Sequence, residues 1–369
     1  MPLHVEIQLV AVVVAAACAL PGVFLVLRRV ALISDAISHS VLLGIVLAFF
    51  WVRDLTHPAL VVAATATGIL TVAMVEALHR SGRVKEDAAI ALVFPALFSI
   101  AVLLIARYAG QIHLDVHSVL LGEIALSPFR RWEVGGIDLG PRSLWMMGGI
   151  LVLNAGAIFL LWKELKLSTF DPALAAALGF SPVVLHYAFM ALVSVTAVGA
   201  FDAVGSILVV ALMIAPPASA WLLTDRLTLM VGLSMVLAVA AALTGFWAAW
   251  ILDVSIAGSM AAMAGVGFLL AFILAPDRGV VAGLRRRARQ RVEFAAMLLA
   301  VHLLHHEGTS DEWVETRIDH LQKHLRWSPD FARRVINRAE FAGWVRREGR
   351  ERLRLTPLGR ETARVGMTR

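Results

Sequence analysis

Asp35 and His39 are the residues of this sequence whose types and spacing most clearly suggest chemistry. They lie four residues apart in a run that continues as a fully apolar stretch to Phe50. Residues at positions i and i+4 of a helix share one face, so both side chains can point at a single spot. A carboxylate and an imidazole directed at one point can bind a divalent transition metal such as Mn²⁺, Fe²⁺ or Zn²⁺.

The cost of placing Asp35 in an apolar helix supports a functional interpretation. A carboxylate at the centre of a membrane helix costs about 2.5–3.5 kcal/mol, so such residues are seldom present without a use. Two protein ligands are too few for a closed structural metal site, so an ion held by this pair alone would be bound weakly and reversibly. A hydrogen bond between buried polar groups of packed helices is the structural alternative.

Further candidate metal ligands occur at polar positions beside apolar runs: His113, Asp115, His117, Glu123 and Asp202. The cluster from 113 to 117 can gather a cation, contact a partner protein or form an ordinary solvated loop. Glu123 lies in an apolar run too short to span a membrane, where it can act as a gate or a second carboxylate. Asp202 lies between two apolar runs, where an unused charge is costly.

The elements that must position these residues are long apolar runs. The chain is 59% hydrophobic with a mean hydropathy of +0.79, well above the roughly 45–50% apolar content of soluble domains. Runs of about 20 apolar residues are long enough to cross a bilayer. The candidate spans are residues 7–27, 31–52, 58–78, 88–107, 143–162, 184–201, 203–223, 228–250 and 257–275. The sequence therefore predicts an all-α polytopic membrane protein with eight or nine spans.

Two features of these spans limit the interpretation. The division of residues 184–223 into two spans is the least certain, because the segment from Gly199 to Gly205 can be a turn between two helices or a kink within one. Prolines at 21, 95, 216 and 217 remove backbone hydrogen bonds and predict either broken helices beside a transport path or ordinary kinks. The single cysteine, Cys18, excludes a disulfide framework within one chain and argues against a copper(I) site.

Charge divides the chain into two parts. Residues 279–369 hold 19 Lys and Arg against 11 Asp and Glu, a net of +8, whereas residues 1–278 hold 14 against 16. The change occurs in a segment punctuated by Pro276 and Gly279. We expect a membrane domain over 1–277 and a soluble domain over 288–369. The basic clusters at 28–29, 79–85, 163–166 and 285–287 are predicted to lie on the cytoplasmic side of the membrane. If nine spans exist, the N-terminus then lies outside.

Three ordered blocks of sequence carry a resemblance to a known family. They are residues 21–29 (PGVFLVLRR) followed by 34–44, residues 163–180 (KELKLSTFDPALAAALGF), and residues 203–218 (AVGSILVVALMIAPPA). Together they resemble the permease subunits of bacterial zinc, manganese and iron ABC importers, over essentially all of residues 1–277. Residues 113–115 and 121–124 resemble the manganese- and iron-leaning branch, so manganese is weakly favoured.

The resemblance implies a division of labour. Two permease subunits, identical or different, form the pathway in the bacterial plasma (inner) membrane, two cytoplasmic ATPases drive it, and an external metal-binding protein delivers the ion. The chain lacks a G-x-x-x-x-G-K-[ST] phosphate loop, so we expect ATP hydrolysis to be the task of a separate subunit. This chain is then expected to be a transport subunit and not an enzyme. The metal ion would be its cargo, and no permanently bound cofactor is expected. Residues 168–180 resemble the helix that docks into the ATPase, with Phe170, Asp171, Pro172, Leu178 and Gly179 as its candidate contacts.

The basic tail predicts a small α+β domain. An amphipathic helix over 288–306, a second over about 311–325 and a third from Ser328 to Phe341 precede an alternating hairpin pattern at 344–356. This order resembles the winged helix of metal-dependent repressors. Arg333, Arg334 and Arg338 are candidate contacts for phosphates or for a partner, and contact with a protein is favoured over nucleic acid or anionic lipid. Residues His302, His305 and His306 are candidate sensors of cytoplasmic metal or ordinary solvated histidines.

Two rival functions stay open at this point. One is a membrane-anchored, metal-responsive transcription regulator that uses the tail on DNA; one or two spans would suffice for it, so eight or nine argue against it. The other is a secondary transporter without an ATPase. The preferred hypothesis is the permease subunit of an ATP-driven importer of divalent transition metal ions.

Overall fold

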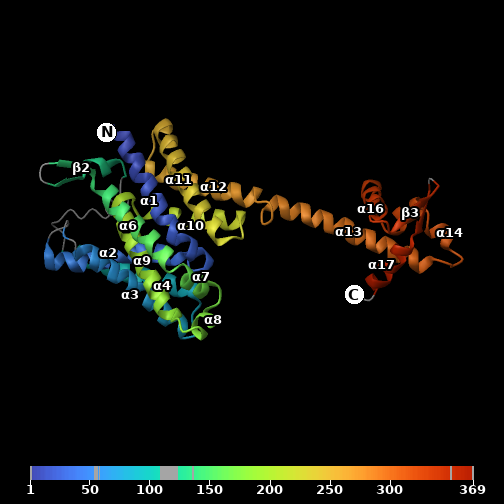
Figure 1. Ribbon diagram of the computed structural model, residues 1–369, viewed down its shortest axis with the longest axis horizontal. Helices are drawn as coiled ribbons and strands as arrows, with labels where there is room; N and C mark the ends of the chain where they lie inside the picture. Colours follow the sequence, from blue (N-terminus) through green and yellow to red (C-terminus); the bar gives the residue numbers. More distant parts are fainter. Residues whose placement is uncertain are drawn as a thin grey trace. The chain divides into compact units, whose positions relative to one another are not determined.

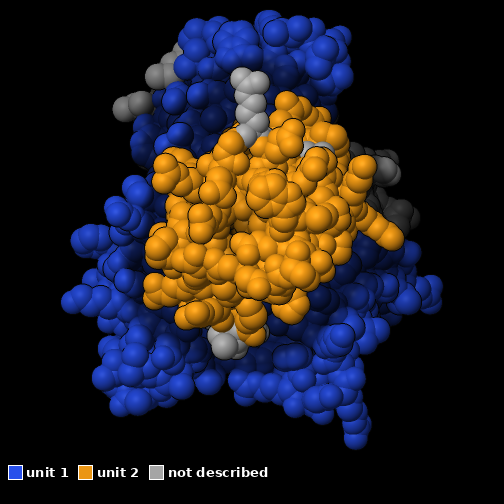
Figure 2. Space-filling view, turned by 90° about the vertical axis from the view of Figure 1, so that its right-hand side faces the viewer, with its two compact units in different colours: residues 1–275 blue, residues 276–369 orange. Residues whose placement is uncertain are grey.

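The computed structural model describes residues 2–53, 57, 59–108, 124–134, 137–349 and 351–367. They form two compact units, residues 1–275 and 276–369, which Figure 2 distinguishes by colour. Each unit is described by itself. The second unit starts before the soluble domain expected from residue 288, because its first helix already begins at Val280.

The first unit is a bundle of membrane-spanning helices. Within the described part of the chain, nine helices are long and apolar enough to cross a bilayer: α1 (Leu3–Leu27), α2 (Leu32–Val52), α3 (Ala59–Arg80), α4 (Glu86–Tyr108), α6 (Arg142–Leu160), α9 (Pro182–Val204), α10 (Ser206–Leu223), α11 (Leu227–Leu252) and α12 (Ile256–Leu274). Helices α9 and α10 are separate, because Gly205 between them has a φ of 83°, a conformation that glycine adopts without steric cost. The predicted all-α polytopic fold is confirmed.

Shorter elements connect these helices. They are η1 (Ile124–Phe129), the antiparallel strands β1 (Arg131–Val134) and β2 (Ile137–Pro141), α7 (Trp162–Phe170) and α8 (Pro172–Ala177). Helix α8 and the β1–β2 hairpin lie at opposite ends of the first unit, and the N-terminus lies at the hairpin end (Figure 1). The sequence pattern did not predict η1 or the hairpin.

Helix α1 is the centre of the first unit. It packs against α6, α9, α10 and α11, and side chains along its length, such as Val10, Val14 and Phe24, are fully buried. Figure 1 shows α1 running through the bundle with α6, α9 and α10 beside it. A helix that is apolar on all sides is expected in such a central position.

The prolines do not break the helices in which they lie. Helix α1 continues through Pro21, α4 through Pro95 and α10 through Pro216 and Pro217. Pro21 has no N–H to offer the carbonyl of Ala17, four residues earlier, and the side chain of Asn154 on α6 donates to that carbonyl at 2.9 Å. Asn154 also exchanges hydrogen bonds with Thr196 on α9. A neighbouring helix therefore replaces the missing bond, as membrane proteins require.

A similar arrangement joins α1 to α10. Pro217 leaves the carbonyl of Met213 without its usual intrahelical donor, and Gly22 lies directly against that carbonyl and the ring of Pro217. A Cβ at position 22 would collide with the Met213 oxygen. Gly22 is needed here because only a residue without a side chain allows the two backbones to approach this closely.

Replacing Asn154 with Ala is expected to destabilise the first unit by about 1–3 kcal/mol, since it leaves the buried Ala17 carbonyl and the Thr196 hydroxyl with fewer partners. Thermal unfolding in detergent measures the effect as a lower Tm. Ser234→Ala is the matched control, because the buried Ser234 hydroxyl donates to the carbonyl of Met230 within its own helix, so its loss should change Tm little. Equal Tm values for the Asn154→Ala variant and the parent would contradict this role.

The second unit is built around one long helix. Its elements are α13 (Val280–His306), α14 (Glu312–Glu315), α15 (Ile318–His324), α16 (Pro329–Phe341), β3 (Val345–Glu348), β4 (Arg352–Leu355) and α17 (Pro357–Met367). Leu299 and Leu303 of α13, Val335 and Ile336 of α16, and Leu353 of β4 form its buried core. The predicted second helix is divided into α14 and α15, and the pattern did not predict α17. The resemblance to a winged helix stays a prediction.

The end of α13 is tied to α17 by an ion pair. Arg360 donates to both carboxylate oxygens of Glu307, the shortest separation being 2.6 Å. This hydrogen bonding lowers the pKa of Glu307, against the smaller opposing effect of burial. The contact joins the C-terminal end of α13 to α17, which lies near the end of the chain, and helps to hold α17 in the second unit.

Candidate functional site

Asp35 and His39 lie on the same face of α2, as their spacing predicts. The Oδ1 atom of Asp35 is 3.4 Å from the Nε2 atom of His39. Both side chains are partly open, with 39% of Asp35 and 30% of His39 exposed. Asp35 lies in the first turn of α2 and not at mid-helix, because the chain turns at Arg29, which has a φ of 63°. A carboxylate in a first helical turn is favoured by the helix dipole, which reduces its cost.

The other polar side chains near this pair are held within the helices. Ser34 and Ser38 are buried and donate to carbonyls of the preceding turn, Ala31 and Ser34 respectively. Ser40 is buried as well and accepts a 2.7 Å hydrogen bond from Thr71 of α3. Asp35 and His39 differ from these serines because their side chains remain partly exposed on α2, available to an ion or to another chain.

Aromatic rings of α4 surround His39. Its ring stacks on Phe94 with 5.8 Å between centroids and meets Phe98 edge-on at 6.0 Å. These contacts hold the imidazole in one orientation beside Asp35. In the described part of the chain, no third His, Cys, Asp or Glu atom joins the pair to form a compact ligand group. The pair therefore offers two ligands from one chain, which suits weak and reversible binding.

Of the remaining predicted ligands, Asp202 is the one among the described residues. His113, Asp115, His117 and Glu123 lie outside the described residues. Asp202, near the end of α9, forms an exposed ion pair with Arg130 at 3.2 Å. The geometry gives Asp202 a basic partner from the segment before β1, so its charge already has a structural role.

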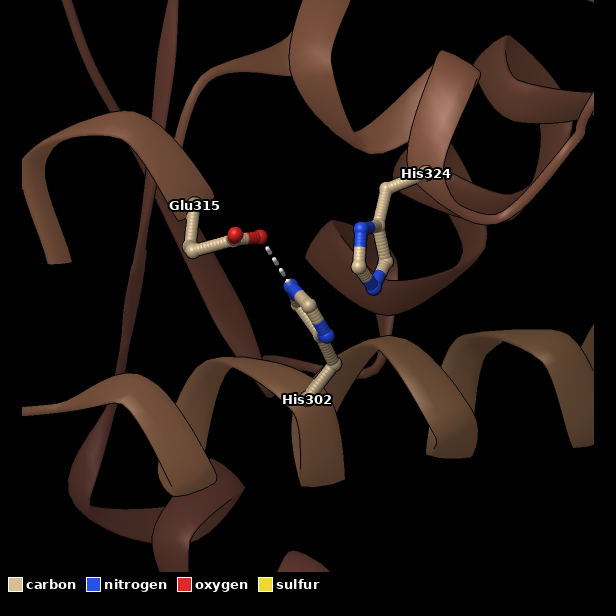
Figure 3. A group of neighbouring side chains, drawn as sticks. All are labelled: His302, Glu315 and His324. Carbon is tan, nitrogen blue, oxygen red and sulfur yellow. Dashed lines mark ion pairs between the residues drawn. The ribbon is translucent and has the colours of Figure 1, made fainter. Parts of the chain in front are cut away.

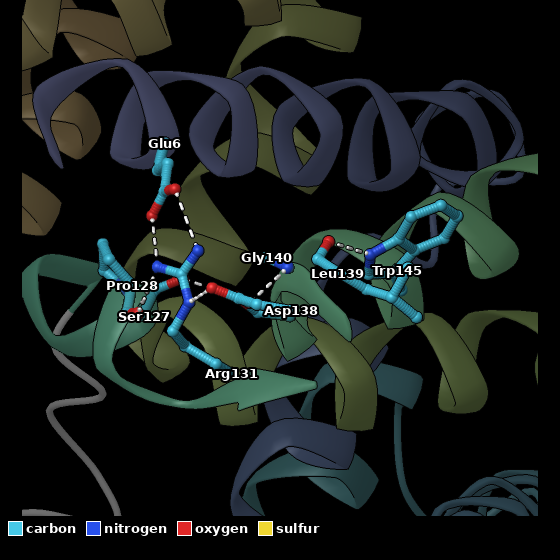
Figure 4. A network of polar contacts seen from close by, with 9 residues as sticks. Glu6, Ser127, Pro128, Arg131, Asp138, Leu139, Gly140 and Trp145 are labelled. Atoms are coloured by element: carbon cyan, nitrogen blue, oxygen red, sulfur yellow. Dashed lines mark hydrogen bonds and ion pairs between the residues drawn. The ribbon is translucent and has the colours of Figure 1, made fainter. Parts of the chain in front are cut away.

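A polar network fastens the β1–β2 hairpin to the start of α1 (Figure 4). Arg131 of β1 contacts both oxygens of Glu6, at 3.2 and 3.4 Å, and also Asp138 of β2 at 2.5 Å. The Arg131 hydrogen bond holds the pKa of Asp138 below its usual value, and the backbone N–H of Gly140 acts in the same direction. The buried Glu6 side chain thereby gains a cation, and the start of α1 is fixed to the hairpin.

The predicted coupling segment lies at the opposite end, in α7 and α8 (Figure 1). Asp171 separates the two helices and caps α8 by accepting the N–H of Leu174 at 2.9 Å, and Pro172 occupies the first helical position. Gly179 ends the segment with a φ of 89°. Phe170 and Leu178 are each 61% exposed. Both apolar side chains therefore stand open to the surroundings, and docking of a partner on this segment stays a prediction.

Arg28 links this segment to the start of α2. Its guanidinium donates to Thr169 at 3.1 Å and to Ser168 at 3.0 Å, and it lies 4.9 Å from the centre of the Phe189 ring. Arg28 precedes Asp35 by seven residues. The sequence pattern placed Arg28 and α7 at one side of the membrane but did not predict this direct contact.

The basic residues predicted to contact phosphates or a partner lie on α16. Arg338 pairs with Glu293 of α13 at 2.6 Å, and Arg333 pairs with Asp330 of its own helix. Arg334 lies over the ring of Phe331, 5.9 Å from its centre. Arg338 thus contributes to packing inside the second unit, and Arg333 already has an acidic neighbour.

Of the three predicted histidines, His302 lies in a group of possible ligands (Figure 3). Its Nε2 atom is 3.2 Å from Glu315, and both lie close to His324. Burial lowers the pKa of His302, and His306 and His324 lower it further, against the opposing effect of Glu315. His305 is exposed and its ring faces His306. Glu315 and His324 were not predicted, although His320 and His324 have the spacing of one helix face.

Comparisons with known proteins cover the first unit, and one of them extends into the second. The zinc transport system membrane protein TroD of Treponema pallidum (strain Nichols) is 49% identical over 344 residues, 93% of this chain and 94% of TroD. The manganese transport system membrane protein MntD of Bacillus subtilis (strain 168) is 47% identical over 270 residues, 73% of this chain and 91% of MntD. The match to TroD is longer than the first unit, so it extends into the second.

The fold of the first unit also matches a solved structure. PsaBC from Streptococcus pneumoniae in complex with Fab aligns with a TM-score of 0.63 and 26% identity, covering 75% of this chain and 94% of that chain. The sequence profile of the ABC 3 transport family matches residues 2–275, the same span as the membrane unit. These similarities give no support to the transcription-regulator alternative. The chain belongs to the ABC 3 transport family.

Proposed function

We propose that this chain is the permease subunit of an ATP-driven importer of a divalent transition metal ion. Its membership of a transport family and the names of TroD and MntD, a zinc and a manganese transport protein, support this assignment. The observation that carries it is the Asp35–His39 pair, a carboxylate and an imidazole 3.4 Å apart on a partly open face of α2. Manganese, iron and zinc all accept such ligands, and the two relatives differ in the metal they are named for.

The pair is proposed to act together with a second permease subunit. One chain supplies two ligands, and a carboxylate that faced lipid at this position would be costly. A second subunit packed against α2 and α4 would shield Asp35 and bring another pair of ligands to the ion. The site would then be shared across the pathway and would hold the metal only while it passes.

The energy for transport is proposed to come from a separate ATPase pair docked at α7 and α8. The exposed Phe170 and Leu178 provide the apolar contact, and Asp171 and Pro172 fix the start of α8. Because Arg28 bonds Ser168 and Thr169, a movement of α7 would reach the turn before α2 and hence Asp35. An external metal-binding protein would deliver the ion at the hairpin end.

The chain is a multi-pass membrane protein, and we place it in the bacterial plasma membrane with the second unit in the cytoplasm. The basic clusters at 28–29 and 163–166 support this orientation by the positive-inside rule. In that orientation α8 faces the cytoplasmic ATPase. The second unit carries a net charge of about +8 and is proposed to contact another protein, through residues such as Arg334.

Metal content of cells tests the proposed function. The chain is expressed with its ATPase and external binding protein in a bacterium that lacks its own manganese and zinc importers, and cell-associated metals are counted by mass spectrometry. We expect accumulation of one or more of manganese, iron and zinc, and none when the ATPase is inactivated. Accumulation that persists without ATP hydrolysis would favour the secondary transporter instead.

A further inference from the structure

A group of ligand-type side chains lies within the second unit. His302 on α13, Glu315 at the end of α14 and His324 at the end of α15 point toward one another (Figure 3). One ligand atom of each lies within 4.8 Å of the others. In the part of the chain that the structure describes, this is the compact His, Cys, Asp and Glu group that has the geometry for a metal ion.

The polar atoms of His302 and Glu315 are buried, whereas His324 is exposed at the edge of the group. Only 10% of the His302 side chain and 14% of the Glu315 side chain are exposed. The Nε2 atom of His302, the Oε2 atom of Glu315 and the Nδ1 atom of His320 are shielded from solvent and make no hydrogen bond of acceptable geometry with any residue that the structure describes. Their close contacts are ion-pair separations to one another, 3.2 Å from His302 to Glu315 and 3.3 Å from His320 to Glu315. Buried polar atoms that lack a well-directed hydrogen bond are rare in native proteins, and they call for a ligand or another explanation.

The spacing of these atoms fits a small cation. The His302 Nε2 to Glu315 Oε2 separation is 3.2 Å, and bonds of about 2.0–2.1 Å to a tetrahedral metal place ligand atoms about 3.3 Å apart. Small side-chain rotations would bring the His324 nitrogen, within 4.8 Å, to the same distance. Two imidazoles and one carboxylate leave a fourth position for water, which is a common arrangement for zinc.

His320 contacts the same carboxylate from outside the group. Its Nδ1 atom is 3.3 Å from the Oε2 atom of Glu315, and its ring stacks on that of His324 at 5.7 Å. A single His–Glu ion pair would account for His302 but not for two further histidines around one carboxylate. Metal-binding carboxylates are commonly oriented by such outer partners.

We propose that His302, Glu315 and His324 bind a divalent transition-metal ion, with Zn²⁺ the best fit, and that His320 positions the Glu315 carboxylate. The ion would cross-link α13, α14 and α15. Without the ion, these three helices are joined by short connecting segments. Occupancy would therefore order the segment from Glu307 to Leu325. This site is separate from Asp35 and His39, and the proposal does not depend on the proposed transport route.

Zinc binding to the full-length protein tests the site. The protein is purified in detergent without a histidine tag, carries Asp35→Asn and His39→Ala to remove the membrane pair, and is stripped with a chelator. Equilibrium dialysis against Zn²⁺, followed by mass spectrometry, counts the bound ions. We expect one tightly held ion per chain, lost in His302→Ala and in Glu315→Gln. His305→Ala is the matched control, because His305 lies on α13 outside the group, and it should keep the ion.

Hydrogen exchange separates loss of the site from loss of the fold. Zn²⁺ should slow exchange in α14 and α15 of the parent but not of Glu315→Gln, whereas exchange in α16 should be equal in both proteins without metal. Because Glu315→Gln keeps the size of the side chain, it remains informative if His302→Ala fails to fold. An unchanged ion count in His302→Ala and Glu315→Gln, or no ion in the parent, would overturn the proposal.

The positioning role of His320 has its own test. His320→Ala should weaken Zn²⁺ binding by about 10- to 100-fold, the usual effect of removing an outer partner. His320→Asn places an N–H near the position of Nδ1 and should restore most of the affinity. Equal affinities of the Ala variant and the parent would show that His320 takes no part.

Discussion

Replacing Asp35 with Asn, or His39 with Ala, is expected to reduce ATP-driven metal uptake to background while leaving assembly intact. Asn keeps the shape of Asp but loses the charge that attracts the cation, and Ala removes the imidazole from its place between Phe94 and Phe98. Each change leaves the metal with at most one ligand from each subunit, too few to replace the water around the ion. Uptake of radioactive manganese or zinc by cells provides the measurement.

Ser38→Ala is the matched control for this experiment. Ser38 lies on α2 between the two ligands, but its hydroxyl is used within the helix, where it donates to the carbonyl of Ser34. Its loss should leave uptake near the parental rate. Purification with the ATPase shows that each variant still assembles. Parental uptake in both Asp35→Asn and His39→Ala would show that the metal takes another route.

Replacing Leu178 with Asp, together with Phe170→Ala, is expected to release the ATPase and abolish uptake. Both side chains are largely exposed, so their loss should not unfold the membrane unit. An apolar anchor of an interface contributes about 2 kcal/mol or more, a roughly thirtyfold effect on affinity for each residue. Copurification of the ATPase and metal uptake should therefore fall together. Leu178→Met keeps the apolar contact and should retain both.

Arg28→Gln separates docking of the ATPase from transmission to the metal pair. Arg28 does not belong to the exposed surface of α8 but ties α7 to the turn before α2. The variant should still bind the ATPase and hydrolyse ATP, yet uptake per ATP should fall. A loss of ATPase binding equal to that in the Leu178→Asp protein would contradict a transmitting role.

The sequence pattern predicted the membrane helices well because the length of an apolar run directly reflects bilayer thickness. The predicted spans 7–27 and 88–107 correspond to α1 (Leu3–Leu27) and α4 (Glu86–Tyr108). The position of the β1–β2 hairpin was not predicted, because the contact that fastens it to α1 joins Arg131 to Glu6, 125 residues away in sequence. A local pattern contains no record of such a partner.

The prolines also show that a local pattern cannot reveal a partner that is distant in sequence. Local chemistry predicts a disturbance at Pro21, and the missing bond is real. The helix continues because Asn154, 137 residues from Ala17 in sequence, supplies the replacement donor. Only the packing of α6 against α1 reveals that Pro21 marks a helix contact and not a break.

Candidate ligands were predictable to different extents. The spacing of Asp35 and His39 placed them on one face, because both belong to one helix. Glu315 and His324 belong to separate short helices, and their approach to His302 depends on how the second unit folds. The spacing of Arg28 and Ser168 likewise says nothing about their hydrogen bond.

Reconstitution into liposomes tests the central claim most directly. The permease and its ATPase are inserted into vesicles in the presence of the external binding protein, and metal on the far side is counted with and without ATP. The account predicts ATP-dependent accumulation of a divalent transition metal by the parent and none by the Asp35→Asn protein. Accumulation that needs no ATP, or that is equal in the parent and in Asp35→Asn, would contradict it.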